Sequence, residues 1–379
     1  MKLLVLAQTP PPLHGQSRAI QSLLDALRSD PRFTVSHVNL PLSRDLADIG
    51  RWRPGKFVGV LRACFQVWML TLRTGRHTLY YVPAPAKRGA LYRDWLIMLL
   101  CRPLCPALVL HWHAVGLGTW LRSQATAPER WLTRRLLGRA DLSIVVADAV
   151  RAEAAELSPR RCLVVPNGVP DPAPPGPRVR RPGAPLEVLF VGAGSREKGL
   201  CDALEGVALA NREGTPCRLT AIGAFVSPAE EQAFHALAHP LGAMVRHLGF
   251  VTDEEVHRQF AAADVFCFPS YYPHEGQPAV LLEALAHDLA IITTRWRGIP
   301  EGLPAELVGF VEPRHPDQIA QQLRRLAQAP PPPGARRAHY LAHFTRDRHL
   351  AALKDALLQA ELPLRNPLQR PPHLANASR

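Results

Sequence analysis

Two glutamates in the second half of the chain have the spacing and surroundings of a ligand-binding turn. Glu275 and Glu283 are separated by seven residues, and Pro278 between them suits the first turn of a helix, where a missing N–H costs little. Glu275 is then on a loop and Glu283 within a helix. With the N–H groups of Gly276 and Gln277 between them, these carboxylates can bind hydroxyl groups at both ends of a phosphate-centred ligand. Alternatively, Glu275 is an ordinary surface charge, whereas Glu283, among apolar neighbours, is expected to have a polar partner.

A glycine-rich turn, Gly192–Gly199, is the second candidate site. It lacks the third glycine of a dinucleotide fingerprint, because Glu197 stands there, and it lacks the lysine of a P-loop, because Leu200 stands there. Backbone N–H groups, Arg196 and Lys198 remain, and together they suit a phosphate group. An ordinary strand-to-helix turn with solvated charges is equally compatible with these residues.

Short apolar stretches alternate with helical patterns, which predicts an α/β fold with parallel sheets. The first series of strand candidates comprises Leu3–Ala7, Val35–Leu40, Thr78–Val82, Leu108–His111, Leu142–Val146 and Leu163–Val165. The second comprises Val188–Gly192, Cys217–Ile222, Val245–Leu248, Val265–Phe268, Ala290–Thr293 and Leu307–Val311. Between them, Pro170–Pro185 is rich in proline, glycine and arginine and predicts a linker. Two such series predict two Rossmann-like domains facing a cleft, with ligands beyond the carboxyl ends of the strands.

Length and composition exclude several classes of protein. The chain has 379 residues, which suits two domains, and its 47% hydrophobic and 20% charged residues exclude a disordered chain. No apolar run approaches the roughly 18–20 residues of a membrane span, and the short run Leu3–Ala7 is not a signal peptide. The seven cysteines are scattered, which suits a reducing cytoplasm and predicts no metal centre.

The charge of the chain is strongly positive, at +13 from 45 basic and 32 acidic residues. Such a balance attracts nucleic acid, anionic membranes or phosphorylated small molecules. Most of the basic residues are arginine, so a bias in genomic composition explains the excess equally well. Lysine is scarce, which makes Lys198 in a glycine-rich turn more informative.

The segment Leu248–Glu301 resembles the donor-binding half of retaining glycosyltransferase family 4, the group 1 glycosyltransferases with the two-domain GT-B fold. The matching motifs within it are Leu248–Val251, Ala263–Val265, Pro269–Ser270, the pair Glu275 and Glu283, and Gly298–Glu301. Looser matches elsewhere are Pro11–Gly15 to the N-terminal glycine loop, His111–His113 to the first-domain histidine motif, Pro166–Val169 to the entry into the linker, and Phe344–Leu358 to the closing helix.

The resemblance implies a division of the chain. Residues 1–170 would form an N-terminal acceptor-side domain, which a C-terminal helix at about 344–360 rejoins. Residues 171–185 would be the linker, and residues 186–335 the C-terminal domain that binds a nucleotide sugar. The polar, proline-rich tail, residues 363–379, is expected to be disordered.

The resemblance also implies roles on the sugar side of the site. Glu275 would contact hydroxyl groups of the transferred sugar, with Gly276 and Gln277 contributing to the donor site. His113 would help to position the sugar. The implied reaction is transfer with retention at the anomeric carbon, through an oxocarbenium-like transition state.

On the phosphate side, the resemblance implies that Glu283 holds the nucleotide ribose. Lys198, together with Arg196, would neutralise the departing diphosphate, and Gly15 would bring backbone N–H groups close to the same phosphates. Because positive side chains can supply this stabilisation, neither a metal ion nor a cofactor is expected. The expected catalytic residues are therefore Glu275, His113 and Lys198.

Four positions depart from the family pattern. Ala193 stands where an arginine is frequent, for which Arg196 is a candidate substitute. Gln16 stands where a second adjacent glycine is common, and Asp288 and Arg297 replace glycines. These changes leave donor binding plausible and the identity of the donor open.

Two apolar stretches of the first domain bear on the acceptor. Phe57–Leu72 and Trp95–Cys101 are rich in aliphatic and aromatic residues, with arginines nearby. Burial under a parallel sheet is the favoured interpretation, and the alternative is an interfacial helix on anionic lipid. A basic first domain suits a lipid-diphosphate-linked acceptor at the inner face of the cytoplasmic membrane.

The sequence therefore predicts a cytoplasmic glycosyltransferase that assembles surface polysaccharide or glycoconjugate from a nucleotide sugar and a glycan or lipid-linked acceptor. A peripheral location at the inner face of the cytoplasmic membrane is the alternative to a fully cytoplasmic one. Rival readings are a sugar-nucleotide epimerase or phosphorylase on the same scaffold, and an inactive relative. A basic nucleic-acid-binding protein is disfavoured, because aromatic residues are not interleaved with Arg and Lys and no recognition motif is present.

Overall fold

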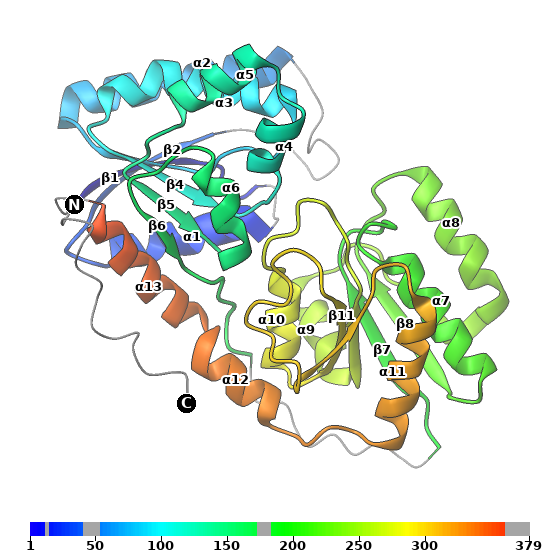
Figure 1. The fold of residues 1–379 in the computed structure, drawn as a ribbon. Helices are drawn as coiled ribbons and strands as arrows, with labels where there is room; N and C mark the ends of the chain where they lie inside the picture. The colour runs from blue at the N-terminus through cyan, green and yellow to red at the C-terminus, as the bar shows by residue number, and fades with distance from the viewer. Residues whose placement is uncertain (12–14, 41–53, 173–182, 361–379) are drawn as a thin grey trace, which may run out of the picture.

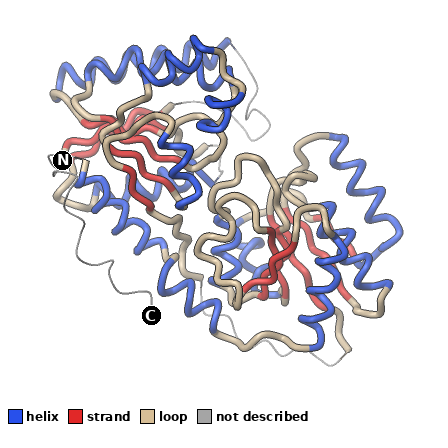
Figure 2. Tube along the Cα trace, in the orientation of Figure 1, coloured by secondary structure: helices blue, strands red, loops and turns tan. Residues whose placement is uncertain are grey.

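The computed structural model describes residues 1–11, 15–40, 54–172 and 183–360. These residues form two α/β domains, each built on a six-stranded parallel sheet (Figures 1 and 2). The predicted fold class is therefore confirmed. Most of the predicted linker, and all of the predicted tail at residues 363–379, lie outside the described residues.

The N-terminal sheet has the strand order β2-β1-β3-β4-β5-β6. Its strands are β1 (Lys2–Ala7), β2 (Thr34–Asn39), β3 (Thr78–Tyr81), β4 (Leu108–Trp112), β5 (Leu142–Val145) and β6 (Cys162–Val164). All neighbouring strands are parallel. The central strands are almost continuously apolar because helices cover both faces of the sheet.

Helices cover the two faces of this sheet in separate groups (Figure 1). One group consists of α1 (Gly15–Arg28) and α13 (Arg346–Gln359). The other consists of α2 (Pro54–Thr74), α3 (Arg88–Cys101) and α5 (Ala127–Leu136). Shorter helices are η2 (Arg102–Leu104), α4 (Leu117–Ser123), η3 (Asp148–Val150) and α6 (Arg151–Ala155).

The two apolar stretches of the first domain have different environments. In α3, the predicted burial is found in part, because Ile97, Met98 and Cys101 are inaccessible to solvent whereas Leu99 is 61% exposed. In α2, the favoured prediction is wrong for the large side chains, because the helix contacts the core mainly through Val60, Ala63, Cys64 and Val67. Among the described residues, no helix has the length and apolarity required to cross a membrane.

The C-terminal sheet has the order β12-β11-β10-β7-β8-β9. Its strands are β7 (Leu186–Val191), β8 (Cys217–Ile222), β9 (Val245–His247), β10 (Val265–Phe268), β11 (Ala290–Thr294) and β12 (Val308–Val311). One face carries α7 (Leu200–Arg212), α8 (Pro228–Ala238) and α11 (Pro316–Gln328), and the other carries α9 (Asp253–Ala262) and α10 (Ala279–Ala286) (Figure 1). The remaining helices are η4 (His239–Met244) and α12 (Ala335–His343), which packs on α10.

Two chain segments cross between the domains side by side. The N–H of Val169 donates to the carbonyl of Phe344 at 3.0 Å, and the N–H of Arg346 donates to the carbonyl of Val169 at 2.8 Å. After this crossing, α13 packs against the N-terminal sheet through Leu353 and Leu357. The C-terminal helix is therefore part of the N-terminal domain's core (Figure 1).

Candidate active site

Lys198 and Glu275 meet at the carboxyl edge of the C-terminal sheet. Nζ of Lys198 lies 2.7 Å from Oε2 of Glu275, and the hydroxyl of Ser270 donates to the same oxygen at 2.7 Å. The ammonium also lies 4.6 Å from the centre of the Tyr272 ring, a cation–π distance. Because the Glu275 side chain is only 9% exposed, this ion pair is less screened by water than a surface pair.

The turn that carries Lys198 can approach the loop that carries Glu275 only because the residue after Lys198 is glycine. Gly199 has φ of +81°, in the left-handed region. A Cβ at this residue would lie 2.4 Å from the carbonyl oxygen of Pro269, which follows β10. The glycine therefore brings the turn after β7 against the loop after β10, the two loops that carry Lys198 and Glu275.

The turn at residues 275–277 also contacts the N-terminal domain. A Cβ at Gly276 would lie 3.0 Å from the carbonyl oxygen of His113 and 3.2 Å from Cγ2 of Val146. The backbone N–H of Asn167 donates to the side-chain oxygen of Gln277 at 2.6 Å. The side-chain Nδ2 of Asn167 donates to the backbone oxygen of Gln277 at 2.9 Å. The structure thus brings the predicted turn and the predicted histidine together across the domain boundary.

His113 follows β4 and is neutral near pH 7. Burial lowers its pKa to about 4, with a smaller contribution from the charge of His349. The centre of its ring lies 4.1 Å from the centre of the His111 ring. Nδ1 of His111 is in turn 2.5 Å from the hydroxyl oxygen of Tyr80. In the described part of the chain, Nε2 of His113 is buried without a hydrogen-bond partner. A neutral imidazole here can form a hydrogen bond with a hydroxyl group without adding charge.

Glu283 lies on α10, near the start of the N-terminal domain's first helix. Burial raises its pKa to about 7, while Arg18 lowers the pKa and Asp253 raises it. Arg18 and Asp253 form an ion pair at 2.6 Å between α1 and α9, so they act on the pKa of Glu283 in opposite directions, and burial is the largest cause of the shift. The carboxyl group therefore changes charge close to neutral pH.

Gly15 is the first residue of α1. The Arg18 ion pair places the first turn of this helix against α9, on the side of the C-terminal domain that carries Glu283. Free N–H groups at a helix N-terminus favour anions. The preceding residues 12–14 of the predicted glycine loop lie outside the described residues.

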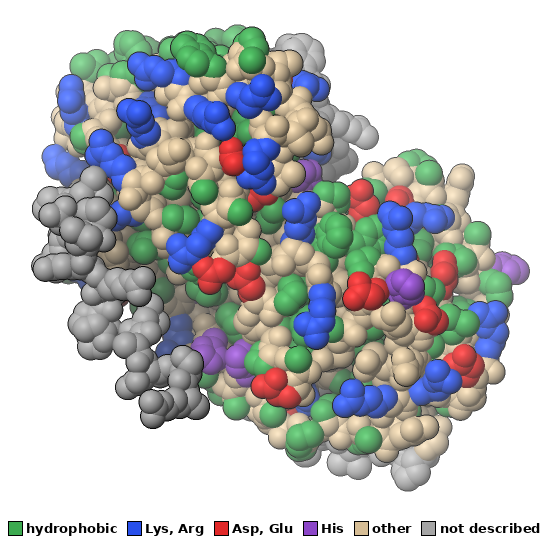
Figure 3. Space-filling view, in the orientation of Figure 1, with side chains coloured by type: hydrophobic (Ala, Val, Ile, Leu, Met, Phe, Trp, Pro, Cys, Tyr) green, Lys and Arg blue, Asp and Glu red, His purple; other side chains and the backbone are tan. Residues whose placement is uncertain are grey.

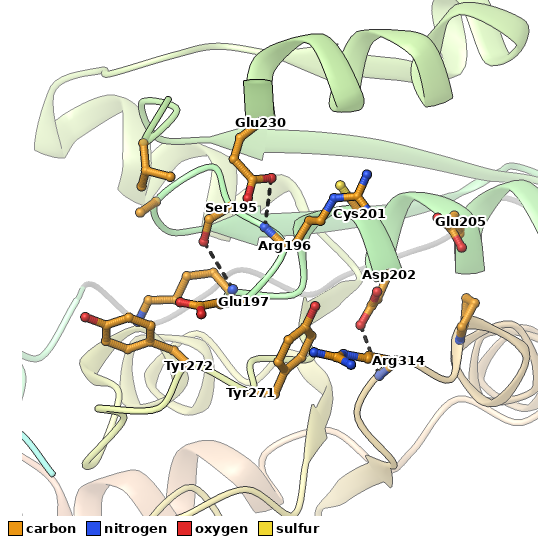
Figure 4. Close-up of a pocket in the computed structure, with 14 residues that line it drawn as sticks. Ser195, Arg196, Glu197, Cys201, Asp202, Glu205, Glu230, Tyr271, Tyr272 and Arg314 are labelled. Carbon is orange, nitrogen blue, oxygen red and sulfur yellow. Dashed lines mark hydrogen bonds between the residues drawn. The ribbon is translucent and has the colours of Figure 1, made fainter. Parts of the chain in front are cut away.

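Arg196 lies on the same turn as Lys198 but extends to a different place. A pocket of about 880 Å³ opens over this turn and is lined by both residues and by carboxylates, arginine and tyrosines of neighbouring loops. In Figure 4, Arg196 extends toward Cys201 and away from Tyr272. Only Lys198 of these two cations contacts Glu275.

The sequence did not assign roles to three residues of this region. Ser270 and Tyr272 contact Glu275 and Lys198, and both belong to the loop after β10, as the parallel-sheet rule could have indicated. The carboxylate of Glu301 accepts hydrogen bonds from the N–H groups of Asp148 and Ala149 in the other domain. No local pattern in the sequence identifies this contact, because its partners are backbone groups about 150 residues away.

The chemistry of the described residues can also be tested against metal binding. None of the seven cysteines forms a disulfide bond. Within the described ranges, no group of three or more His, Cys, Asp or Glu side chains is arranged to hold a metal ion.

Comparison with known proteins gives a family for the C-terminal domain. Residues 185–329 match the family described as "Glycosyl transferases group 1". The chain is 29% identical over 203 residues to WcaL of Escherichia coli K12, named as a colanic acid biosynthesis glycosyltransferase. That match covers 52% of this chain and 50% of the relative, so the chain spans about half the length of the curated relatives it matches.

Solved structures resemble the whole chain. Sucrose-phosphate synthase of Thermosynechococcus elongatus has a TM-score of 0.74 at 17% identity, covering 95% of this chain and 99% of that one. The Anabaena protein HepE, solved in complex with UDP and glucose, has a TM-score of 0.67 at 16% identity, covering 94% and 99%. Residues 185–329 thus form a group 1 glycosyltransferase domain, within a chain of GT-B fold.

Proposed function

We propose that the chain is a retaining glycosyltransferase that moves a sugar from a nucleoside diphosphate donor to a glycan or lipid-diphosphate-linked acceptor. The observation that carries this proposal is the pairing of Lys198 with Glu275 opposite His113, at the junction of the two domains. The family match of residues 185–329 and the name of the Escherichia coli relative support it, as does the complex of the Anabaena neighbour with UDP and glucose.

Lys198 supplies the positive charge for the leaving group. When a diphosphate enters, its oxygens compete with Glu275 for the Lys198 ammonium. Charge develops on the diphosphate as the bond to the anomeric carbon breaks, so a fixed ammonium stabilises the transition state more than the ground state. No metal ion is required in this scheme.

Glu275 and His113 act on the sugar. Glu275 remains positioned by Ser270 when Lys198 turns to phosphate, and its carboxylate accepts hydrogen bonds from sugar hydroxyl groups. Neutral His113, across the boundary, orients the ring from the other side. In a transfer with retention, the bond from the anomeric carbon to the diphosphate breaks, the acceptor oxygen bonds to that carbon on the same face, and the acceptor hydroxyl gives its proton to the departing diphosphate.

Glu283, together with the first turn of α1, completes the donor site. Its carboxylate accepts hydrogen bonds from ribose hydroxyl groups, and the N–H groups at Gly15 face the diphosphate. The proposed acceptor is a glycan or a saccharide on a lipid diphosphate at the inner membrane face. The product class is surface polysaccharide or glycoconjugate.

The first test is a thermal-shift screen of nucleoside diphosphates. A ligand that binds only the folded protein raises the melting temperature by mass action. We expect one nucleoside diphosphate to raise it clearly and the corresponding monophosphate to raise it less, because Lys198 serves the second phosphate. Equal melting temperatures across the whole panel would contradict the proposed donor site.

The second test follows the reaction by NMR. The donor that matches the selected nucleotide is supplied with and without a glycan acceptor, in the presence of a chelator. Retention appears as the same anomeric configuration in donor and product, and the reaction proceeds with the chelator present. Conversion of the donor sugar into its epimer without acceptor would instead identify an epimerase.

A further inference from the structure

The outer face of α2 presents a continuous apolar stripe to solvent. Its large apolar side chains are between 40% and 79% exposed, namely Phe57, Val58, Leu61, Phe65, Trp68 and Leu72. At 3.6 residues per turn, these positions fall within about 100° of the helix circumference, over a length of about 22 Å. Single exposed apolar residues are common on proteins, but a stripe of six on one helix marks a binding surface.

The charges around this stripe have one sign. The layer formed by α2, α3 and α5 contains eight basic residues, namely Lys56, Arg62, Arg73, Arg88, Arg93, Arg130, Arg134 and Arg135. Its two acidic residues, Asp94 and Glu129, are buried. Asp94 accepts hydrogen bonds from the Tyr81 hydroxyl and the Ala84 N–H, and Glu129 pairs with Arg88. Arg93 also pairs with Asp94, and Arg134 pairs with Glu156, so part of the positive charge is neutralised, but none of the acidic side chains of these three helices is exposed.

Figure 3 shows this surface from the side. Hydrophobic side chains gather along the edge formed by α2 and α5, and Lys and Arg side chains cover the surface beside them. On α2, Arg62 and Arg73 fall about 40–60° beyond the stripe on a regular helix. An apolar stripe bordered by arginine is the composition of helices that lie in a membrane interface.

We infer that this face, the α2 stripe with its bordering arginines, is a docking surface for an anionic lipid bilayer. The apolar side chains enter the boundary between headgroups and acyl chains, while Arg62 and Arg73 contact anionic headgroups. A second copy of this chain fits less well, because face-to-face association would bring the Arg62 and Arg73 side chains of both copies together without acidic side chains of α2 to pair with them. The inference rests on the proposed function in one respect only, since a lipid-diphosphate-linked acceptor gives the contact its purpose.

The test is cosedimentation of the full chain with vesicles. At low salt, the wild-type protein should bind vesicles that contain phosphatidylglycerol, should not bind pure phosphatidylcholine, and should dissociate at high salt because the charges are screened within about 10 Å at 0.1 M. Phe65→Glu and Leu72→Glu, each at an exposed site, should weaken partitioning about tenfold or more. Replacing Arg62 or Arg73 by alanine should weaken it about fivefold.

A matched control variant distinguishes binding through this surface from non-specific adsorption to vesicles. Met244, in η4 of the other domain, is 41% exposed, and Met244→Glu adds the same charge at an exposed apolar position. Trp68 is left intact because its Nε1 donates to the carbonyl of Leu100 at 2.8 Å and holds α3. Thermal unfolding of each variant checks that the fold is retained.

Several results would overturn the inference. One is that the wild-type protein does not bind the vesicles at low salt. Another is that Met244→Glu reduces vesicle binding as much as Phe65→Glu and Leu72→Glu do. A third is that the protein without lipid is a dimer, which Phe65→Glu converts to a monomer. Nucleotide thermal shifts, measured on the same variants, test the proposed function separately. Vesicle binding without a nucleotide-induced rise in melting temperature would support the docking surface and refute the donor site. A rise in melting temperature without vesicle binding would support the donor site and refute the docking surface.

Discussion

At the scale of single residues, the chemistry depends on how Lys198 divides its contacts. Its ammonium touches the carboxylate of Glu275 and the ring of Tyr272, and each contact fixes the ammonium at the edge of the cleft. Arg196, two residues earlier, extends toward Cys201 (Figure 4). The two cations of the glycine-rich turn therefore have different surroundings, although the sequence presents them as neighbours.

Lys198→Ala is expected to impair catalysis far more than Arg196→Ala. Loss of a charged contact to a diphosphate in the transition state should cost about 2–4 kcal/mol, or roughly 30- to 1000-fold in kcat. Steady-state kinetics on both variants measures the difference, and thermal unfolding checks that the fold is retained. Small, equal losses would show that this turn does not bind the diphosphate.

The two glutamates are expected to separate binding from turnover. Glu283→Gln should mainly weaken the affinity for free nucleoside diphosphate, because Glu283 serves the ribose. Glu275→Gln should mainly lower kcat, because the free nucleotide carries no sugar for it to contact. Calorimetry with the nucleoside diphosphate and steady-state kinetics distinguish these effects, and the reverse pattern would refute both assignments.

The raised pKa of Glu283 makes nucleotide affinity depend on pH. In the proposed donor site its ionised form accepts hydrogen bonds from ribose, and burial raises its pKa to about 7. Affinity in the wild-type protein should therefore rise between pH 6 and pH 8 more steeply than in Glu283→Gln. The phosphate group of the nucleotide changes charge equally in the experiments with both proteins. The difference between the two pH dependences therefore reports the ionisation of the Glu283 carboxyl group. Parallel profiles would place Glu283 outside the site.

At the scale of elements, two departures from the family pattern have a physical explanation. Asp288 and Arg297 stand where glycine is usual, and both adopt left-handed backbone with φ of +55° and +51°. Asp288 offsets this strain by capping α12, because its carboxylate accepts from the N–H groups of Gly334 at 2.5 Å and Arg337 at 3.2 Å. Arg297 is exposed, and its guanidinium group lies over the Trp296 ring.

Asp288→Ala is therefore expected to destabilise the protein more than Asp288→Gly. Both lose the α12 cap, but only alanine retains the left-handed strain, so the two should differ by about 1 kcal/mol. Arg297→Gly is the control, because it relieves the same strain without removing a cap, and it should leave stability nearly unchanged or slightly higher. Urea denaturation gives the three free energies of unfolding. An alanine variant as stable as the glycine variant would contradict this explanation.

At the scale of the whole molecule, a few polar contacts hold the two domains in their present arrangement. They include the Arg18–Asp253 ion pair, the Asn167–Gln277 hydrogen bonds, the hydrogen bonds between Val115 and His274, and the contact of Glu301 with the N–H groups of Asp148 and Ala149. The Glu301 contact caps the start of η3 across the boundary, and a carboxylate at a helix N-terminus is a favourable pairing.

Glu301→Ala is expected to let the domains separate. Two charge-assisted hydrogen bonds are lost, so small-angle scattering should give a larger radius of gyration for this variant. Glu306→Ala, an exposed position on the same loop, is the control and should match the wild-type protein. Nucleoside diphosphate should reduce the difference, because the donor contacts both domains in the proposed site. Identical scattering from all three proteins would show that Glu301 does not control the arrangement.

The sequence by itself determined the architecture and the local placement of the site residues. Alternating apolar strands and helices specify two parallel sheets, since such strands need helices on both faces. Because parallel strands end at one edge, the residues after each strand must gather there. Glu275, Lys198 and His113 each follow a strand, so the sequence could indicate the edge to which each belongs.

Only the tertiary structure decided which of these residues meet and which surfaces stay open. Lys198 contacts Glu275 although the two residues are 77 positions apart, and Gly276 lies close to the backbone of His113 across a domain boundary. Neither distance follows from spacing, because both depend on how loops and domains pack. The periodicity of α2 shows where its apolar side chains lie but not whether another element covers them. In this fold the described residues leave its large side chains at least 40% exposed, although Trp68 donates a hydrogen bond to the carbonyl of Leu100 on α3.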